Sequence, residues 1–211
     1  MADTSSPAPG RRLILQMHVS LDGFVGTPSG DVGWIFPSFD AEYTAWQVAS
    51  LRAAGTHVMG SHTGRSMAAY WPRPAAIDPR DAPFAAPMND TPKVVFSQSL
   101  ESLDWPNTRI ARGGLVPEID ALKAEPGNPI LAHGGAKFAA SLSRLGLVDE
   151  YHLLLQPVIL GIGLRLFPEW TEPLHLELVE TRAFPSGAVL HVSRPAPLRR
   201  AAAPPSGATD A

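Results

Sequence analysis

Residues 129–146, PILAHGGAKFAASLSRLG, determine the fold class. The first five residues form a short apolar run that predicts a buried strand. Gly134 and Gly135 follow, and residues 136–145 then predict a helix that Gly146 terminates. A strand that passes through two glycines directly into a helix is typical of an α/β domain.

The rest of the chain continues this alternation of strands and helices. On the N-terminal side, Asp40 is a plausible N-cap for a helix that runs to about Ala54. Pro117 suits the first turn of another helix, which reaches Lys123. Strands are expected at residues 13–19, 56–60, 93–97, 108–111 and 149–156, and a terminal hairpin at 174–178 and 188–193. We predict one α/β domain with a central mixed, mostly parallel sheet, flanking helices and a C-terminal β-hairpin.

Both ends of the chain differ in composition from this body. Residues 1–10 and 195–211 contain small, polar and proline residues and almost no large apolar side chain, which predicts disorder. The folded domain is therefore expected at about residues 11–194. Six prolines lie between residues 72 and 92, which predicts a long irregular loop inside that domain.

Composition excludes several classes of function. The 211 residues carry a net charge of −3, which argues against a nucleic-acid binder. The absence of cysteine excludes disulfides, thiolate metal sites and cysteine nucleophiles. No apolar run is long enough to span a membrane, and the first ten residues lack a secretory signal pattern. We expect a cytoplasmic protein with no membrane and no nucleic-acid partner.

Three predicted strand ends carry small polar residues. Gly134-Gly135 precedes a helix whose free N–H groups favour an anion, although a glycine pair of this kind is often only a tight connection. The second end, Gly60 to Gly64, reads as a plain turn when taken alone. The third is Ser97-Gln98-Ser99. Because ligands of open α/β sheets bind beyond the carboxyl ends of strands, the three ends together predict a binding site.

Other known site patterns do not fit. The chain has no phosphate-binding G-x-x-x-x-G-K motif, and the Gly161-Ile162-Gly163 segment lacks the third glycine of a dinucleotide fingerprint. In the run from Gly60 to Gly64, the central residue is His62 rather than the serine of a nucleophile elbow. The seven histidines show no metal-ligand spacing, so no metal site is expected.

Asp22 and Asp40 are the carboxylates nearest to the predicted site. Either could act as a catalytic acid. Each also has a structural interpretation that is at least as good. Asp22 belongs to an Asp-Gly turn pair, and Asp40 is a natural N-cap.

These pieces occur in a familiar order. Ser20 to Phe24 follows the first strand, Val58 to Thr63 follows the first helix, and Lys93 to Ser97 forms the next strand. The most specific run extends from Gly134 to Gly163. Over about residues 11–194 the chain resembles the dihydrofolate reductase-like superfamily, in particular the reductase (C-terminal) domain of the bifunctional riboflavin-biosynthesis protein.

This resemblance implies a reductase that uses NADPH, acts on a small molecule and is often a homodimer. It places the nicotinamide over the first strand and the loop from Ser20 to Gly26, and the pyrophosphate at the start of a helix. The residues implied for the pyrophosphate are Gly134, Gly135, Ala136 and Lys137. Those implied for the adenosine end are Gly60, Ser61, His62, Thr63, Ser97 and Gln98. Asp40 lies close to the position of the substrate-binding acid in dihydrofolate reductases.

Two positions depart from the family pattern. Arginine is usual where this chain has Ser61, and frequent where it has Gln98. Such arginines bind the 2′-phosphate that distinguishes NADPH from NADH, so NADH is an alternative cofactor. His62 or Arg65 could compensate. Gly64 also replaces an aromatic residue that is usual in the family.

The sequence therefore leaves two classes of function open. The first is an NAD(P)H-dependent reductase that transfers a hydride to a small heterocycle, pterin-like or pyrimidine-like, with the proton coming from Asp22, Asp40 or water. The alternative is a non-catalytic or repurposed member of the fold that binds a nucleotide or small ligand in a specialised pathway.

Overall fold

The computed structural model describes residues 10–73, 78–168 and 170–196. The predicted disordered ends, residues 1–10 and 195–211, lie almost wholly outside these ranges. The strands are β1 (Leu13–Ser20), β2 (Phe24–Gly26), β3 (Thr56–Gly60), β4 (Lys93–Phe96), β5 (Thr108–Ala111), β6 (Ile130–Ala132), β7 (Glu150–Gln156), β8 (Leu164–Arg165), β9 (Leu176–Ala183) and β10 (Val189–Pro195). The helices are the 3-10 helix η1 (Gly33–Ser38) and the α-helices α1 (Ala41–Ala53), α2 (Ser61–Tyr70), α3 (Ala82–Asp90), α4 (Leu115–Ala124) and α5 (Ala136–Arg144).

One mixed sheet forms the centre of the domain. Its strand order is β5-β4-β3-β6-β1-β7-β10-β9. Every pair from β5 to β7 is parallel, whereas β10 pairs antiparallel with both β7 and β9. The mostly parallel sheet and the C-terminal hairpin are therefore confirmed. β2 and β8 form a separate two-stranded ribbon.

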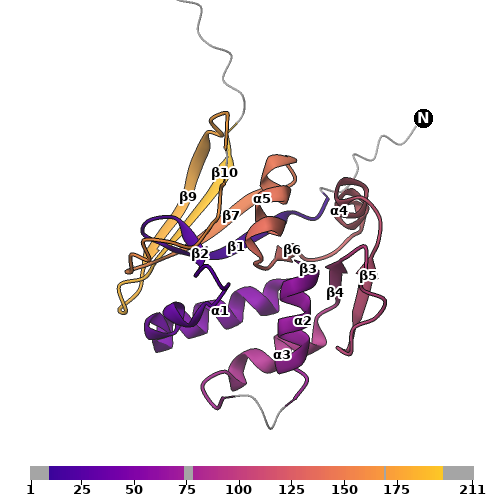
Figure 1. Cartoon of the computed structure of the whole chain (residues 1–211), viewed down its shortest axis with the longest axis horizontal. Coiled ribbons are helices and arrows are strands. Elements are labelled where there is room, and N and C mark those ends of the chain that lie inside the picture. Colours follow the sequence, from indigo (N-terminus) through magenta and orange to yellow (C-terminus); the bar gives the residue numbers. More distant parts are fainter. Residues whose placement is uncertain (1–9, 74–77, 169, 197–211) are drawn as a thin grey trace, which may run out of the picture.

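Helices cover both faces of the sheet (Figure 1). The side chains of β1 alternate between two cores, with Leu13, Leu15 and Met17 facing α4 and α5. Ile14 points to the opposite face, where side chains of α1, α2 and α3 pack. Burial on both faces explains why β1 reads as an almost continuous apolar run.

Local signals in the sequence account for two helix ends. The Asp40 carboxylate accepts a hydrogen bond from the Tyr43 backbone N–H at 2.9 Å, which confirms the N-cap of α1. Gly146 follows α5 with a φ of +65°, and the Leu147 N–H bonds to the Leu142 carbonyl at 3.0 Å. This is the left-handed helix end that favours glycine.

Two expectations for residues 60–92 were wrong. The predicted loop at 72–92 contains α3, and the remaining part at 74–77 lies outside the described residues. Pro83 is the second residue of α3, where a backbone N–H has no partner in the helix, so this proline costs little. The buried Lys93 ammonium then bonds the carbonyls of Met88, Asn89 and Thr91 at the far end of α3.

The second correction concerns Gly60 to Gly64, which the sequence alone reads as a turn. Gly60 is the N-cap of α2, and Gly64 lies within the helix. A Cβ added at Gly64 would lie 2.9 Å from Cγ1 of Val95, so glycine allows α2 to pack closely on β4. An aromatic residue is usual at this position in the family that the sequence resembles, and its side chain would be too large for this packing.

Candidate active site

The topology creates a crevice between two adjacent strands. β3 and β6 are parallel neighbours, so their carboxyl ends meet at the same edge of the sheet. β3 leads into α2 on one face, and β6 leads into α5 on the opposite face. A point where successive helices leave to opposite faces is where open α/β sheets bind ligands.

The starts of α2 and α5 lie side by side in this crevice. The hydroxyl of Thr63 in α2 donates to the Gly134 carbonyl at 3.0 Å. A Cβ added at Gly60 would lie 3.3 Å from Cβ of Phe138 in α5. The N-caps are Gly60 and Gly135, so neither helix has a side-chain cap. Two sets of uncapped first-turn N–H groups therefore face one space, and both helix dipoles favour an anion there.

Both the backbone conformation at position 135 and the close approach of Thr63 require a glycine there. Its φ is +92°, and an added Cβ would lie 3.0 Å from the Thr63 hydroxyl oxygen. Ala136 and Lys137 form the first turn of α5, with the Lys137 side chain exposed. The structure thus brings Gly60, Ser61, His62 and Thr63 together with Gly134 to Lys137, as predicted.

The third predicted strand end lies one strand further along. Ser97 follows β4, and its hydroxyl accepts the Leu100 N–H at 3.0 Å in a tight turn. The side-chain amide of Gln98 donates to the Arg112 carbonyl at 2.9 Å. Both residues are therefore at the same edge of the sheet, toward β5.

Ser20 and Asp22 lie on the other side of the crevice, after β1. The Asp22 carboxylate accepts hydrogen bonds from the Ser20 hydroxyl at 2.7 Å, the Leu160 N–H at 3.1 Å and the Gly161 N–H at 2.7 Å. The bond from Ser20 is the largest cause that lowers the pKa of Asp22 to about 2. Asp22 is thus ionised at neutral pH, and it joins the loop after β1 to the loop after β7.

The Asp40 carboxylate also accepts hydrogen bonds from backbone N–H groups of separate segments. Besides the Tyr43 N–H, its carboxylate accepts the Ser186 N–H at 2.8 Å, which ties α1 to the turn of the β9-β10 hairpin. These bonds, that of Tyr43 first, lower the pKa of Asp40. One carboxylate therefore serves as N-cap, as tether and as part of a pocket wall.

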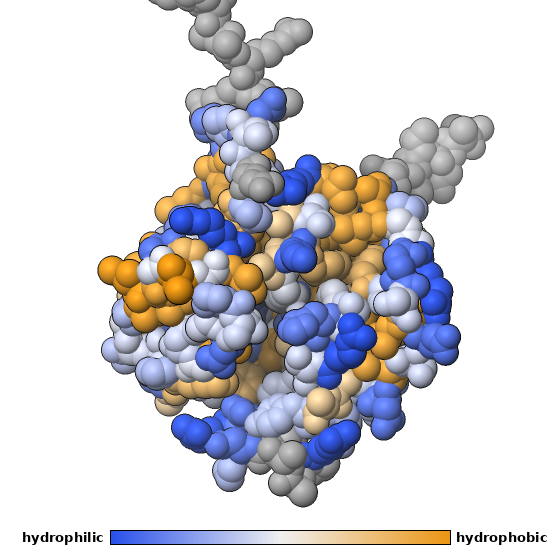
Figure 2. Space-filling view, in the orientation of Figure 1, coloured by the Kyte–Doolittle hydropathy of each residue, from blue (hydrophilic) through white to orange (hydrophobic). Residues whose placement is uncertain are grey.

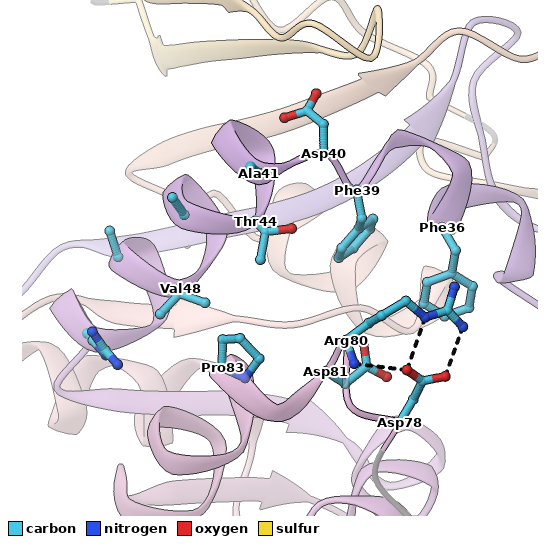
Figure 3. Close-up of a pocket in the computed structure, with 13 residues that line it drawn as sticks. Phe36, Phe39, Asp40, Ala41, Thr44, Val48, Asp78, Arg80, Asp81 and Pro83 are labelled. Carbon is cyan, nitrogen blue, oxygen red and sulfur yellow. Dashed lines mark hydrogen bonds and ion pairs between the residues drawn. The ribbon is translucent and has the colours of Figure 1, made fainter.

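That pocket lies between α1 and residues 78–83 and has a volume of about 1080 Å³. Figure 2 shows a hollow with pale-orange walls near the centre of this face. Figure 3 shows Phe36 and Phe39 at one end, Thr44 and Val48 on α1, and Pro83 opposite. At the mouth, Arg80 is held by Asp78 through bonds of 3.0 and 2.8 Å. The lining combines this apolar wall with Thr44 and with charged residues at positions 40, 52, 78, 80 and 81, and a pocket of this size suits a small organic ligand.

His18 connects this pocket to the central strand, and the sequence analysis did not single it out as a site residue. It lies near the carboxyl end of β1 and stacks on Phe39, with ring centroids 6.0 Å apart. Its Nδ1 lies 2.7 Å from the Tyr43 hydroxyl, and its Nε2 lies 3.1 Å from the side-chain nitrogen of Gln47. Burial lowers the pKa of His18 to about 4, so it is neutral at pH 7. A polar side chain in a mostly apolar strand was the signal that could have revealed it, although Gln16 in the same strand gives the same signal.

A family model described as the RibD C-terminal domain matches residues 11–190. The chain belongs to the RibD C-terminal domain family.

Two kinds of relatives support this assignment. The uncharacterized protein YyaP of Bacillus subtilis (strain 168) is 32% identical over 180 residues, which cover 85% of this chain and 92% of YyaP. A putative riboflavin biosynthesis protein from Shewanella sp. PV-4 superposes with a TM-score of 0.67 at 19% identity, covering 88% of this chain and 99% of that chain. The structural likeness confirms the dihydrofolate reductase-like fold of this RibD C-terminal domain.

A third relative is bifunctional. It is the diaminohydroxyphosphoribosylaminopyrimidine deaminase/5-amino-6-(5-phosphoribosylamino)uracil reductase of Thermotoga maritima, with a TM-score of 0.62 at 19% identity. The match covers 89% of this chain but 57% of that protein.

Neither a cluster of metal ligands nor a membrane-spanning helix occurs among the described residues. No group of three or more His, Asp or Glu side chains in these ranges is arranged to hold a metal ion. Among the same residues, no helix combines the length and the apolar character that crossing a bilayer requires.

Proposed function

We propose that this protein is an NAD(P)H-dependent reductase that transfers a hydride to a small pterin-like or pyrimidine-like heterocycle. The observation that carries the proposal is the pair of uncapped helix starts at the carboxyl ends of β3 and β6. A separate pocket of about 1080 Å³ along α1 would hold the substrate. Membership of a family named after a riboflavin-biosynthesis reductase domain supports it.

The residues of the crevice suit a dinucleotide. Gly134 and Gly135 bring the backbone of the strand end to the start of α5 without side chains, and the first-turn N–H groups of α5 would donate to a pyrophosphate there. Gly60 to Thr63, with Ser97 and Gln98, would hold the adenosine end, while Ser20 and the loop to Gly26 would support the nicotinamide. When bound, the reduced nicotinamide supplies the hydride.

The pocket residues suit a flat ring. One wall of the pocket is formed by alanines that recur every four residues along α1, at positions 41, 45 and 49. Their small side chains leave space for a ring to lie against the helix. Phe36 and Phe39 offer aromatic faces at the end nearest β1, with centroids 5.8 Å apart. The Thr44 hydroxyl is a polar group positioned to bond the edge of such a ring.

Reduction of a C=N or C=C bond also needs a proton. Asp22 and Asp40 are ionised at neutral pH, and N–H donors already occupy their oxygens. In this proposal both carboxylates therefore hold loops and order water, and a water molecule delivers the proton. Asp22 positions the two loops beneath the nicotinamide, and Asp40 fixes the end of the substrate pocket.

The alternative function is a protein that binds a nucleotide but has lost turnover. The replacements Ser61, Gln98 and Gly64 favour it, because they remove groups that are usual in the family. Loss of the nicotinamide absorbance in the presence of reducible pterins and pyrimidines distinguishes the two. For a reductase we expect NADPH consumption with at least one such heterocycle, and a deuterium label at the nicotinamide C4 should appear in the product. Tight binding without label transfer would instead establish the alternative.

A cytoplasmic homodimer completes the proposal. Every residue of the edge strand β9 is exposed, including Leu176 and Leu178, and Ile159 and Ile162 project from the neighbouring loop. Apolar surface of this kind marks an interaction site. Light scattering of the purified chain should give about twice the 22.5 kDa monomer mass, and a monomer at micromolar concentration would contradict this part of the proposal.

A further inference from the structure

The residue that selects between NADPH and NADH can be sought at the outer end of the crevice. This inference rests on the proposed nucleotide site. With the pyrophosphate at the starts of α2 and α5 and the nicotinamide over β1, the adenosine half extends the other way. It would pass over β3 and β4 toward β5, the edge strand on that side.

The two positions expected to bind a 2′-phosphate carry no charge in this chain. Ser61 begins α2, and Gln98 follows β4. The Gln98 amide nitrogen is directed to the Arg112 carbonyl at 2.9 Å. A charged side chain that distinguishes NADPH from NADH must therefore belong to another residue at this edge of the sheet.

Arg112 is brought to this place by the pairing of β4 with β5. The Ser97 N–H donates to the Ala111 carbonyl at 3.1 Å, and Gln98 bonds the next carbonyl along. Arg112 thus lies beside Ser97 at the carboxyl end of β5. Gly113 and Gly114 follow it, and they place no side chain over its guanidinium.

The guanidinium of Arg112 keeps its charge available. The side chain is exposed, and its bond within the described residues is a long one, 3.4 Å from Nη2 to the Glu101 backbone carbonyl. A backbone carbonyl does not neutralise a cation. Arg109 on the same strand differs, because its Nη1 lies 2.9 Å from the Glu118 carboxylate.

We infer that Arg112 binds the 2′-phosphate of NADPH and so preserves a preference for NADPH over NADH, despite Ser61 and Gln98. A guanidinium presents paired N–H donors that match phosphate oxygens, and it stays charged at any physiological pH. Position 98 after β4 carries glutamine in place of arginine, and Arg112 after the neighbouring strand β5 supplies a guanidinium at the same edge of the sheet.

The test is a fluorescence titration of the full chain with NADPH and with NADH. The wild type should bind NADPH roughly tenfold or more tightly than NADH, as one charge-assisted contact allows. Arg112→Gln should remove this ratio while leaving the Kd for NADH within about twofold. Titration with 2′,5′-ADP and ADP gives the same comparison without any nicotinamide.

Two control variants make the test specific. Arg109→Gln removes an equal charge from the middle of β5 and should leave the NADPH:NADH ratio unchanged. Arg65→Gln tests the other available arginine, on α2. A wild-type ratio near one, or a ratio that survives in Arg112→Gln but is lost in Arg65→Gln, would overturn the inference and leave the nucleotide site intact. Absence of binding by both nucleotides would overturn the proposed function together with it.

Discussion

Replacing Lys137 by glutamate is expected to weaken NADPH binding by about a hundredfold. Lys137 is in the first turn of α5, and its side chain is exposed at the proposed pyrophosphate site. Like charges about 4 Å apart repel by roughly 1 to 4 kcal/mol, depending on how well water screens them. That range corresponds to a loss of about fivefold to a thousandfold in affinity.

This substitution separates binding from folding. Glutamate in the first turn of a helix is favourable, so Lys137→Glu should keep or raise the thermal stability. Lys137→Gln has the same shape without the new charge and should lose only severalfold in affinity. Gly135 is a poorer target, because any side chain there is strained at a φ of +92°. Equal affinities of Lys137→Glu and the wild type would place the nucleotide elsewhere.

Mild acid is expected to destabilise the fold through two buried histidines. His57 on β3 and His133 after β6 lie edge to face, with ring centroids 4.6 Å apart, and both are buried. His57 Nδ1 and His133 Nε2 have no hydrogen-bond partner within the described structure. Burial lowers the pKa of His57 to about 4, and burial together with the nearby histidines lowers the pKa of His133 well below its usual value.

The direction of the effect follows from proton binding. An unfolded histidine takes up a proton near pH 6.5, whereas folded His57 does so only near pH 4. Between these values the unfolded state binds more protons, so stability is complete above pH 6.5 and is lost as the pH falls. Each histidine should contribute a loss of about 2 kcal/mol between pH 7 and pH 5. Against a typical total of roughly 5–15 kcal/mol, the two together are a large fraction.

Urea unfolding at pH 7 and at pH 5 measures this loss. His57→Leu removes one of the two groups, so its unfolding free energy should change less between the two pH values than that of the wild type. The comparison uses the change with pH, so a constant packing cost of leucine cancels. Identical changes in the variant and the wild type would show that His57 does not resist protonation in the fold.

The sequence predicted the sheet and the proximity of residues 60–63 to residues 134–137 better than the segments between them. A strand that runs through Gly134 and Gly135 into a helix specifies its own geometry, because both local conformation and packing depend on the glycines. The loop at 72–92 was predicted wrongly because six prolines argue against a helix. Pro83 lies where helices tolerate proline, whereas Pro87 lies inside α3, and the burial of Phe84 and Met88 holds the helix in place despite it.

The pocket along α1 could not be predicted from the sequence, for a physical reason. Its walls come from η1, α1 and residues 78–83, and only the folded chain brings these together. His18 was overlooked because its role depends on Tyr43 and Gln47, which lie far along the chain on α1. Asp22 follows β1 and Asp40 lines the pocket along α1, but their hydrogen bonds to distant backbone N–H groups become visible only in three dimensions.

The central claim is that α2 and α5 together hold a nicotinamide dinucleotide. Titration of the purified chain with NADPH, followed by quenching of tryptophan emission and enhancement of nicotinamide emission, tests it most directly. Saturable one-to-one binding in the micromolar range, weakened by about a hundredfold in Lys137→Glu and only severalfold in Lys137→Gln, is the result that we expect. No saturable binding of either NADPH or NADH at millimolar concentration would contradict the account.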